Sequence, residues 1–138
     1  MKYKTVRCIL DKNDYYLLAQ HNNWRPETIG KWGLPGGHID KGEDCLATVK
    51  REILEEFKIE LDDWQEIGDY SYRKAWHKVF ACKYYGDKKL DFDRKEILNI
   101  NWFNYADLLE LEQNNMFHTG FELAAITKYR KKSQNLPT

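Results

Sequence analysis

Alternating hydrophobic and polar residues recur in several stretches of the chain, and this two-residue period is typical of β-strands. The first such stretch is residues 3–10, and the turn-forming segment Asp11-Lys12-Asn13-Asp14 separates it from the second. These features predict a β-hairpin at the start of the chain. A stretch within residues 76–85 is apolar on both faces, which predicts a strand that is covered on both sides. The expected extended segments are residues 3–10, 15–20, 31–34, 66–74, 76–85 and 98–103.

A helical period replaces this alternation in the middle of the chain. Leu46, Val49, Ile53 and Phe57 recur at the spacing of one helix face, so they predict an apolar stripe that packs against the rest of the fold. Further helices are expected after Asn104, a residue suited to helix capping, and near the end of the chain. The expected helices are residues 45–57, residues 105–111 and a final helix that ends near Lys131.

The order of these elements predicts an α/β fold in which a mixed sheet lies between helices. With 138 residues, 42% of them hydrophobic, the chain is expected to form a single domain over residues 1–138. No stretch approaches the ~18 apolar residues of a membrane helix, and the start lacks the apolar segment of a signal peptide. We therefore expect a cytoplasmic protein with no membrane partner.

Charge and cysteine content exclude some classes of function. The 22 basic residues balance the 22 acidic residues, so no global positive field favours a nucleic-acid polymer as the partner. Cys8, Cys45 and Cys82 lie far apart in the sequence and include no Cys-x-x-Cys pair. This pattern predicts free, buried thiols in a reducing compartment.

The helix over residues 45–57 carries a second, acidic face. Glu52, Glu55 and Glu56 lie at the i, i+3 and i+4 positions, where like charges repel by roughly 0.2–0.5 kcal/mol per pair. A hard divalent cation removes this repulsion, because carboxylate oxygens are the ligands that Mg²⁺ and Mn²⁺ prefer. The alternative interpretation is an ordinary solvated helix surface.

The spacing of charged residues and glycines around this helix matches a known pattern. Gly37 is followed by five residues and Glu43, and then by seven residues and Arg51-Glu52-Ile53-Leu54-Glu55-Glu56. This spacing resembles the signature of the Nudix (MutT-like) hydrolases. Lys58 stands where that family has a glycine. This difference leaves the position of the helix end undecided, but it removes no acidic residue. The resemblance implies a Nudix-like α/β/α sandwich, in which the signature forms a strand, a loop and a helix.

The resemblance also implies a metal site and an enzymatic activity. It assigns metal ligation to Glu52, Glu55 and Glu56, with the backbone carbonyl of Gly37 nearby. The implied cofactor is Mg²⁺ or Mn²⁺, and the implied reaction is hydrolysis of a phosphoanhydride bond.

Supporting roles and the general base are assigned in the same way. Arg51 is implied to pair with the glutamates of the signature, and Glu43 is implied to support the site through a salt bridge or a bound water. Members of the family differ in the general base, so Glu52, Glu56 and a later acid, Glu96, are all candidates. For Glu96, an ordinary surface charge is the alternative.

Substrate recognition must come from residues outside the signature. His38 follows the glycines and could contact phosphate, although a solvent-exposed loop histidine is the alternative. By analogy with MutT-like nucleotide hydrolases, Asn115 and Phe117 are the candidates for a nucleobase pocket. Other aromatic candidates for contact with a base are Trp24, Tyr72, Trp76 and His77.

The favoured expectation is a Mg²⁺-dependent hydrolase that splits a nucleoside triphosphate, including an oxidised one, into monophosphate and pyrophosphate. Dinucleoside polyphosphates, nucleotide sugars, ADP-ribose and capped RNA ends remain open as substrates. A non-catalytic nucleotide-binding module is the alternative from another class. Such modules commonly lose the acidic residues of the signature, whereas this chain keeps Glu43, Glu52, Glu55 and Glu56. The sequence makes no prediction about oligomeric state.

Overall fold

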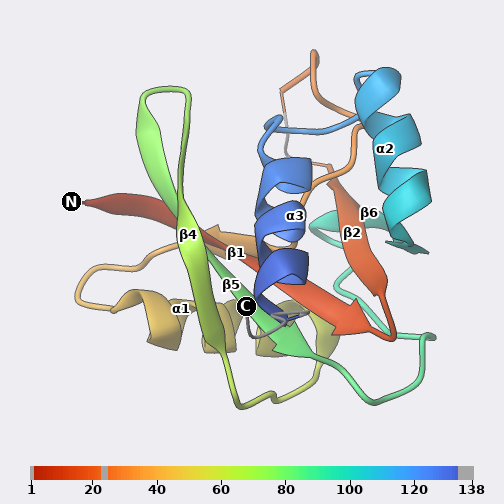
Figure 1. Ribbon diagram of the computed structural model, residues 1–138. Coiled ribbons are helices and arrows are strands. Elements are labelled where there is room, and N and C mark those ends of the chain that lie inside the picture. The colour runs from red at the N-terminus through yellow and green to blue at the C-terminus, as the bar shows by residue number, and fades with distance from the viewer. Residues whose placement is uncertain (1, 23–24, 134–138) are drawn as a thin grey trace.

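A computed structural model describes residues 2–22 and 25–133 of the chain. Its strands form one mixed sheet in the order β4-β5-β1-β2-β6, and β3 pairs along part of β1 (Figure 1). Strands β1 and β5 are parallel, and the other neighbouring strands are antiparallel. The strands are β1 (Tyr3–Lys12), β2 (Tyr15–His21), β3 (Gly36–His38), β4 (Gln65–Tyr72), β5 (Ala75–Lys83) and β6 (Ile97–Phe103).

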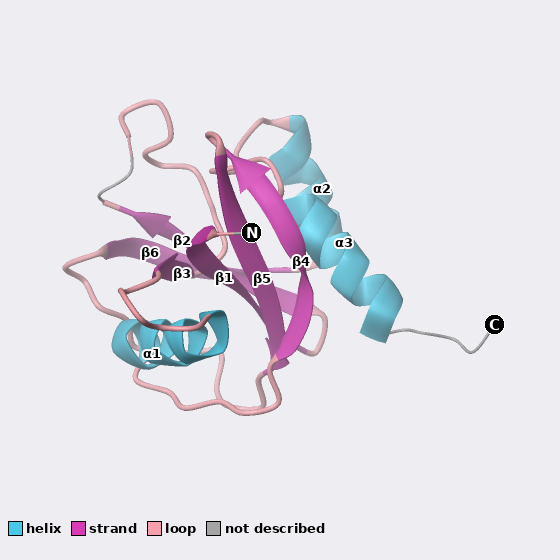
Figure 2. Ribbon diagram, turned by 90° about the vertical axis from the view of Figure 1, so that its left-hand side faces the viewer, coloured by secondary structure: helices cyan, strands magenta, loops and turns pink. Residues whose placement is uncertain are grey.

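Helices cover both faces of this sheet. Helix α1 (Cys45–Phe57) lies on one face, whereas α2 (Tyr105–Gln113) and α3 (Glu122–Ser133) lie on the other (Figure 2). This arrangement confirms the α/β/α sandwich with a mixed sheet between helices. None of the helices in the described part of the chain is long and apolar enough to cross a membrane.

Two hydrophobic cores, one on each face of the sheet, follow from the alternation along β1. Val6, Cys8 and Leu10 are fully buried on the α1 side, while Ile9 is buried on the side of α2 and α3. The strand is therefore covered on both faces, which explains its nearly continuous run of apolar residues. From α1, the buried hydrophobic residues are Val49, Ile53 and Phe57, and from α3 they are Ala125, Ile126 and Tyr129.

One edge of β1 is shared between two partners, and this division positions the functional site. The first half of β1 pairs with β3, including Arg7 with Gly36, and only its last residues pair with β2. Gly36 has φ +148°, and a Cβ there would lie 2.1 Å from the backbone oxygen of Val6. A side chain at this position would therefore collide with the neighbouring strand. Glycine allows the loop before α1 to run directly along β1.

Three local expectations differ from the structure. The segment Gly36–His38 was not among the expected extended segments but forms β3, because pairing with β1 stabilises an extended conformation that glycine does not itself favour. Residues 31–34 contribute only isolated bridges. Leu46 was expected in the buried stripe, but it is 42% exposed. The buried face of α1 instead includes Glu52 and Glu56, so it is rotated toward the acidic residues.

Lys58 ends α1 in the left-handed conformation, with φ 60° and ψ 31°, and its amide donates to the oxygen of Leu54. We expect Lys58→Gly to raise the free energy of unfolding by about 0.5–1 kcal/mol, because glycine adopts this conformation without steric cost. Chemical denaturation of both proteins measures the change. A destabilised variant would show that the hydrogen bond from Lys58 Nζ to the oxygen of Glu55 outweighs the backbone strain.

Candidate active site

A pocket of about 430 Å³ lies where β1 and β5 begin and β2 ends. It lies at this end of the sheet because β1 and β5 run parallel and β2 is antiparallel to β1. Residues from β3, α1, the β4–β5 turn and the segments before β6 and α3 complete it. The carboxylates that line it, here called the acidic group, are Asp40, Glu52, Glu56 and Glu96.

Glu56 is the most deeply buried member of the acidic group. Its exposed fraction is 1%, and among the described residues neither carboxylate oxygen accepts a well-aligned hydrogen bond, although the backbone of Gly36 is close enough to lower its pKa slightly. Burial raises the pKa of Glu56 well above its ordinary value, and the charges of Glu52 and Glu96 add to this rise, while Arg7 opposes it. A buried carboxylate without partners is unfavourable unless a proton or a cation neutralises it. Glu56 is therefore suited to bind a cation.

Glu52 lies beside Glu56 against the backbone of β3. It is 9% exposed, and burial is the main cause of its raised pKa. A Cβ built on Gly37 would lie 2.4 Å from the Glu52 carboxylate carbon, so the glycine leaves space for this carboxylate at the strand. The structure thus places Glu52 against Gly37, which also lines the pocket.

Arg51 connects the glutamates of the signature. It donates to both carboxylate oxygens of Glu43, at 2.6 and 2.9 Å, and to Glu52 at 3.0 Å and Glu55 at 3.3 Å. The hydrogen bond from Arg51 is the largest cause of the fall in the Glu43 pKa to about 2. Glu43 does not line the pocket, and it also accepts from the amide of Asp40 and the hydroxyl of Thr48. These bonds fix the loop before α1 to the helix.

We expect Arg51→Met to lower the affinity for Mn²⁺ by about 10–100-fold, because residues that orient metal ligands typically contribute that much. The methionine keeps much of the side-chain volume but cannot hold Glu52 and Glu43 in place. A calorimetric titration of Mn²⁺ into the wild type and the variant measures the change. Equal affinities would show that Arg51 does not position the glutamates for an ion.

The donor set is compatible with a divalent cation. Glu56 supplies two unpartnered carboxylate oxygens, and Glu52 lies next to it on the same helix face. No group of three or more His, Cys, Asp or Glu side chains in the described ranges forms a complete cage. Mg²⁺ is usually held by one or two carboxylates together with waters and substrate phosphates, so a complete cage is not required.

The structure brings some of the predicted site residues to the pocket and leaves others outside it. His38 and Glu96 line the pocket together with Glu52 and Glu56, and both are exposed. Glu55 does not line it, because Glu55 lies on the exposed side of α1 and contacts Arg51. A metal-binding role for Glu55 remains a prediction that requires its side chain to turn.

Asn115 and Phe117 are not brought to the pocket. Phe117 is 5% exposed and packs in the core between the sheet and α3. Asn115 is exposed and has φ 55°, directly after α2. The residues that follow, His118 and Thr119, line the pocket instead. The predicted segment thus reaches the pocket, but through its later residues.

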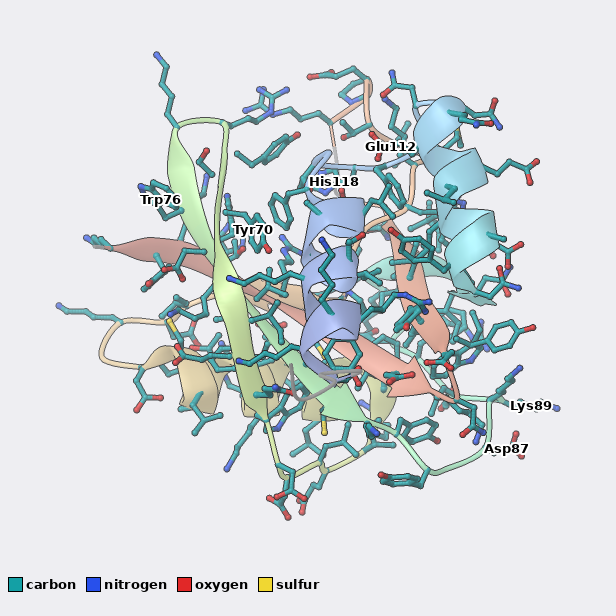
Figure 3. The ribbon with its side chains drawn as sticks, viewed as in Figure 1. Tyr70, Trp76, Asp87, Lys89, Glu112 and His118 are labelled. Atoms are coloured by element: carbon teal, nitrogen blue, oxygen red, sulfur yellow. The ribbon has the colours of Figure 1, made fainter. Side chains whose placement is uncertain are left out.

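The aromatic candidates also separate into two groups. Tyr72 and His77 line the pocket, and the Thr5 hydroxyl lies 2.6 Å from His77 Nδ1. Trp76 is exposed and lies on the outer side of the β4–β5 hairpin, away from His118 (Figure 3). Trp24 lies outside the described residues.

Sequence reasoning missed the basic part of the pocket. The lining includes four cationic side chains, here called the basic group, and every histidine of the chain. One signal was present, since Arg7 is a charged residue within the apolar run from Val6 to Leu10 of β1. Arg25 and Arg73 come from other segments, so their convergence with Lys4 and Arg7 of β1 had no signal in the sequence. The basic group is Lys4, Arg7, Arg25 and Arg73, and the histidines are His21, His38, His77 and His118.

The fold and the pocket together define a class: an α/β/α sandwich with an acidic helix beside a polar pocket. The family model of the NUDIX domain matches residues 1–121. The chain belongs to the NUDIX domain family, whose hydrolases generally use a divalent metal ion.

Known proteins similar to this chain include two bacterial enzymes. The NAD-capped RNA hydrolase NudC of Pectobacterium carotovorum is 26% identical over 102 residues, which cover 72% of this chain and 38% of that protein. The nucleoside triphosphatase NudI of Salmonella agona is 39% identical over 57 residues, covering 41% of this chain and 40% of that protein. The chain therefore spans about two fifths of the length of these relatives.

A solved structure with a similar fold is a binary complex of the C. elegans Ap4A hydrolase. It is 18% identical, has a TM-score of 0.76, and the match covers 96% of this chain and 100% of that chain. At this identity the likeness shows the fold alone.

Proposed function

We propose that this protein is a divalent-metal-dependent hydrolase that cleaves a phosphoanhydride bond in a nucleoside diphosphate derivative. The observation that carries this proposal is the pair Glu52 and Glu56 at the pocket wall, where both Glu56 oxygens are buried and have no well-aligned hydrogen-bond partner among the described residues. A binding module without catalysis would have no need for this unfavourable carboxylate.

The proposed reaction adds water across the phosphoanhydride bond. The water oxygen bonds to one phosphorus atom, the bridging P–O bond breaks, and the bridging oxygen leaves with the other phosphate. Glu96 lines the pocket and forms no ion pair within the described residues, so we assign it the role of accepting the proton of the water. Glu52 and Glu56 are the alternative proton acceptors.

Glu52 and Glu56 would hold a Mg²⁺ or Mn²⁺ ion, with the Gly37 carbonyl as a further oxygen ligand. When bound, this ion neutralises phosphate charge that would otherwise repel the attacking water. Arg51 keeps Glu52 in position, and Arg7 supplies a fixed positive charge in the same pocket. These side chains already occupy their positions before substrate binds, so the site needs little reorganisation during the reaction.

Among possible substrates we favour a nucleoside triphosphate, cleaved to monophosphate and pyrophosphate. The similarity to a protein named nucleoside triphosphatase supports this choice, but that match covers 41% of this chain. The relative named NAD-capped RNA hydrolase makes a capped RNA end the second candidate, so a polymeric partner stays open. The remaining candidate substrates are a dinucleoside polyphosphate, a nucleotide sugar and ADP-ribose.

Incubation with a panel of these compounds, with Mg²⁺, Mn²⁺ or chelator, tests the proposal and names the substrate. Phosphate-containing products are separated by ion-exchange chromatography. We expect release of nucleoside monophosphate in the presence of metal and none in chelator. Binding of a nucleotide without release of product from any compound would favour the non-catalytic module.

A further inference from the structure

Apart from two glycines, every described residue that lines the pocket beside Glu52 and Glu56 has a side chain with a polar group. Among the described residues, no aliphatic or phenylalanine side chain lines it, and Tyr72 is its single tyrosine. Pockets that recognise a nucleobase or another flat ring are usually lined mainly by apolar and aromatic side chains. The lining is thus better suited to the charged part of a nucleotide than to its base.

The aromatic surface of Tyr72 is also largely occupied. Its ring centroid lies 5.5 Å from that of His118 and 6.2 Å from that of His77, and the Arg73 guanidinium lies 5.7 Å away over the ring. Tyr72 and His118 are too close together for a base to lie between them. Tyr72 therefore supports its neighbours instead of offering an open face for stacking.

The basic group is largely free to bind an anion. Within the described residues, no carboxylate forms an ion pair with Lys4, Arg7 or Arg25, and Arg73 pairs only with Glu27. Arg7 is partly buried, and its single hydrogen bond among these residues goes to the oxygen of Leu34 at 3.4 Å. A partly buried guanidinium with unused donors is suited to bind phosphate oxygens.

The lowered pKa values of the four histidines indicate a positive potential in the pocket. Burial is the main cause of their lowered pKa values, and the charge of Arg7 lowers each of them further. The pKa values of His21 and His118 fall to about 3 and about 4. At neutral pH these two imidazoles are uncharged, so the positive charge comes from the basic group.

The basic group extends from the acidic group to the tip of the β4–β5 hairpin. Arg7 pairs with Gly36 in the sheet, next to the acidic group, and both Arg7 and Arg73 line the pocket. Arg73 belongs to the turn after β4 and is exposed, whereas Arg7 belongs to β1. An extended polyphosphate could thus contact Arg7 near the cleaved bond and Arg73 farther along.

We propose that Arg7, Lys4 and Arg73 form a subsite for the terminal phosphate of the substrate, so that the enzyme selects its substrate by phosphate charge and not by base. This inference rests on the proposed function. It narrows the substrate class to nucleotides that end in a free phosphate, and it excludes strong preference for one base. Arg73 would exchange Glu27 for the terminal phosphate when substrate binds.

Steady-state kinetics on two kinds of substrate test this subsite. The substrates are a purine and a pyrimidine nucleoside triphosphate, and a nucleoside diphosphate sugar carrying one of the same bases. The variants are Arg73→Met and, as the matched control, Arg94→Met. Arg94 is also an exposed arginine over an aromatic ring, with its guanidinium 4.2 Å from the Phe92 ring centroid, but it does not line the pocket.

We expect Arg73→Met to raise the KM for both triphosphates about tenfold, because the variant loses one charge-assisted hydrogen bond to the terminal phosphate. Its effect on the KM for the sugar nucleotide should stay below about twofold, because that substrate has no terminal phosphate. Glu27→Gln should change the triphosphate KM in the opposite direction, since it releases Arg73. The control should match the wild type, and the wild-type kcat/KM values for the two bases should agree within about tenfold.

The outcomes separate this inference from the proposed function. If the wild type hydrolyses none of these substrates in the presence of metal, the proposed function itself fails. If it hydrolyses them but Arg73→Met has no effect, or raises every KM equally, the terminal-phosphate subsite is wrong. A preference for one base by more than about a hundredfold would also overturn it. Thermal unfolding of each variant confirms that the fold is retained.

Discussion

Replacing Glu56 by glutamine is expected to lower turnover by about 10²–10⁴-fold while the protein stays folded. Glutamine has nearly the same shape as glutamate, but it cannot supply a charged ligand to a divalent ion or accept a proton. The control is Glu110→Gln, which removes an exposed carboxylate from α2. Turnover is measured with the best substrate of the panel. Near-wild-type turnover of Glu56→Gln would remove Glu56 from the mechanism.

The same substitution is expected to stabilise the metal-free protein at neutral pH. Burial raises the pKa of Glu56 above its ordinary value near 4.5, so the folded protein holds a proton that the unfolded chain has released. Between these two pKa values stability falls as pH rises, and glutamine avoids this loss. Thermal unfolding in chelator should therefore show a higher midpoint for the variant than for the wild type, with a difference that grows as the pH rises above the ordinary pKa near 4.5.

Alanine at the two adjacent glycines of β3 is expected to have opposite consequences. At Gly37 the new Cβ would meet the Glu52 carboxylate at 2.4 Å, and this flexible side chain can move away. Gly37→Ala should stay folded and lose activity by about 10–100-fold, because Glu52 is displaced. At Gly36 the Cβ would lie 2.1 Å from the Val6 oxygen, which is backbone. Gly36→Ala should destabilise the fold by about 3 kcal/mol or more.

Chemical denaturation and turnover assays on both alanine variants measure these effects. Gly68→Ala serves as the control, because its Cβ would meet side-chain atoms and no backbone: Lys128 Nζ at 3.1 Å and the Tyr70 ring at 3.3 Å. A stable Gly36→Ala protein would show that β3 can move away from β1. A fully active Gly37→Ala protein would show that the position of Glu52 beside this strand is not needed for catalysis.

Local signals in the sequence were sufficient for the elements themselves. The helical period after Asp44 predicted residues 45–57, and α1 spans Cys45–Phe57. The boundaries agree because Asp44 caps the start, where it accepts a hydrogen bond from the amide of Ala47 at 2.8 Å, and Lys58 ends the helix. The layered α/β fold followed from the order of the strands and helices.

Features that depend on pairing between distant segments could not be predicted in the same way. Strand β3 exists because β1 pairs with it, and the exposure of Leu46 depends on how α1 is rotated on the sheet. The acidic part of the pocket was predicted because its main residues share one helix. The basic group comes from β1, the loop after β2 and the β4–β5 turn, so only the three-dimensional structure brings it together.

The central claim, that Glu52 and Glu56 bind a divalent ion in this pocket, is tested most directly by a Mn²⁺ titration followed by electron paramagnetic resonance. The wild type is compared with the double variant Glu52→Gln/Glu56→Gln and with the control Glu110→Gln. We predict that the wild type and the control bind Mn²⁺ with equal affinity and that the double variant binds it at least about a hundredfold more weakly. Equal Mn²⁺ affinity in all three proteins would contradict this site.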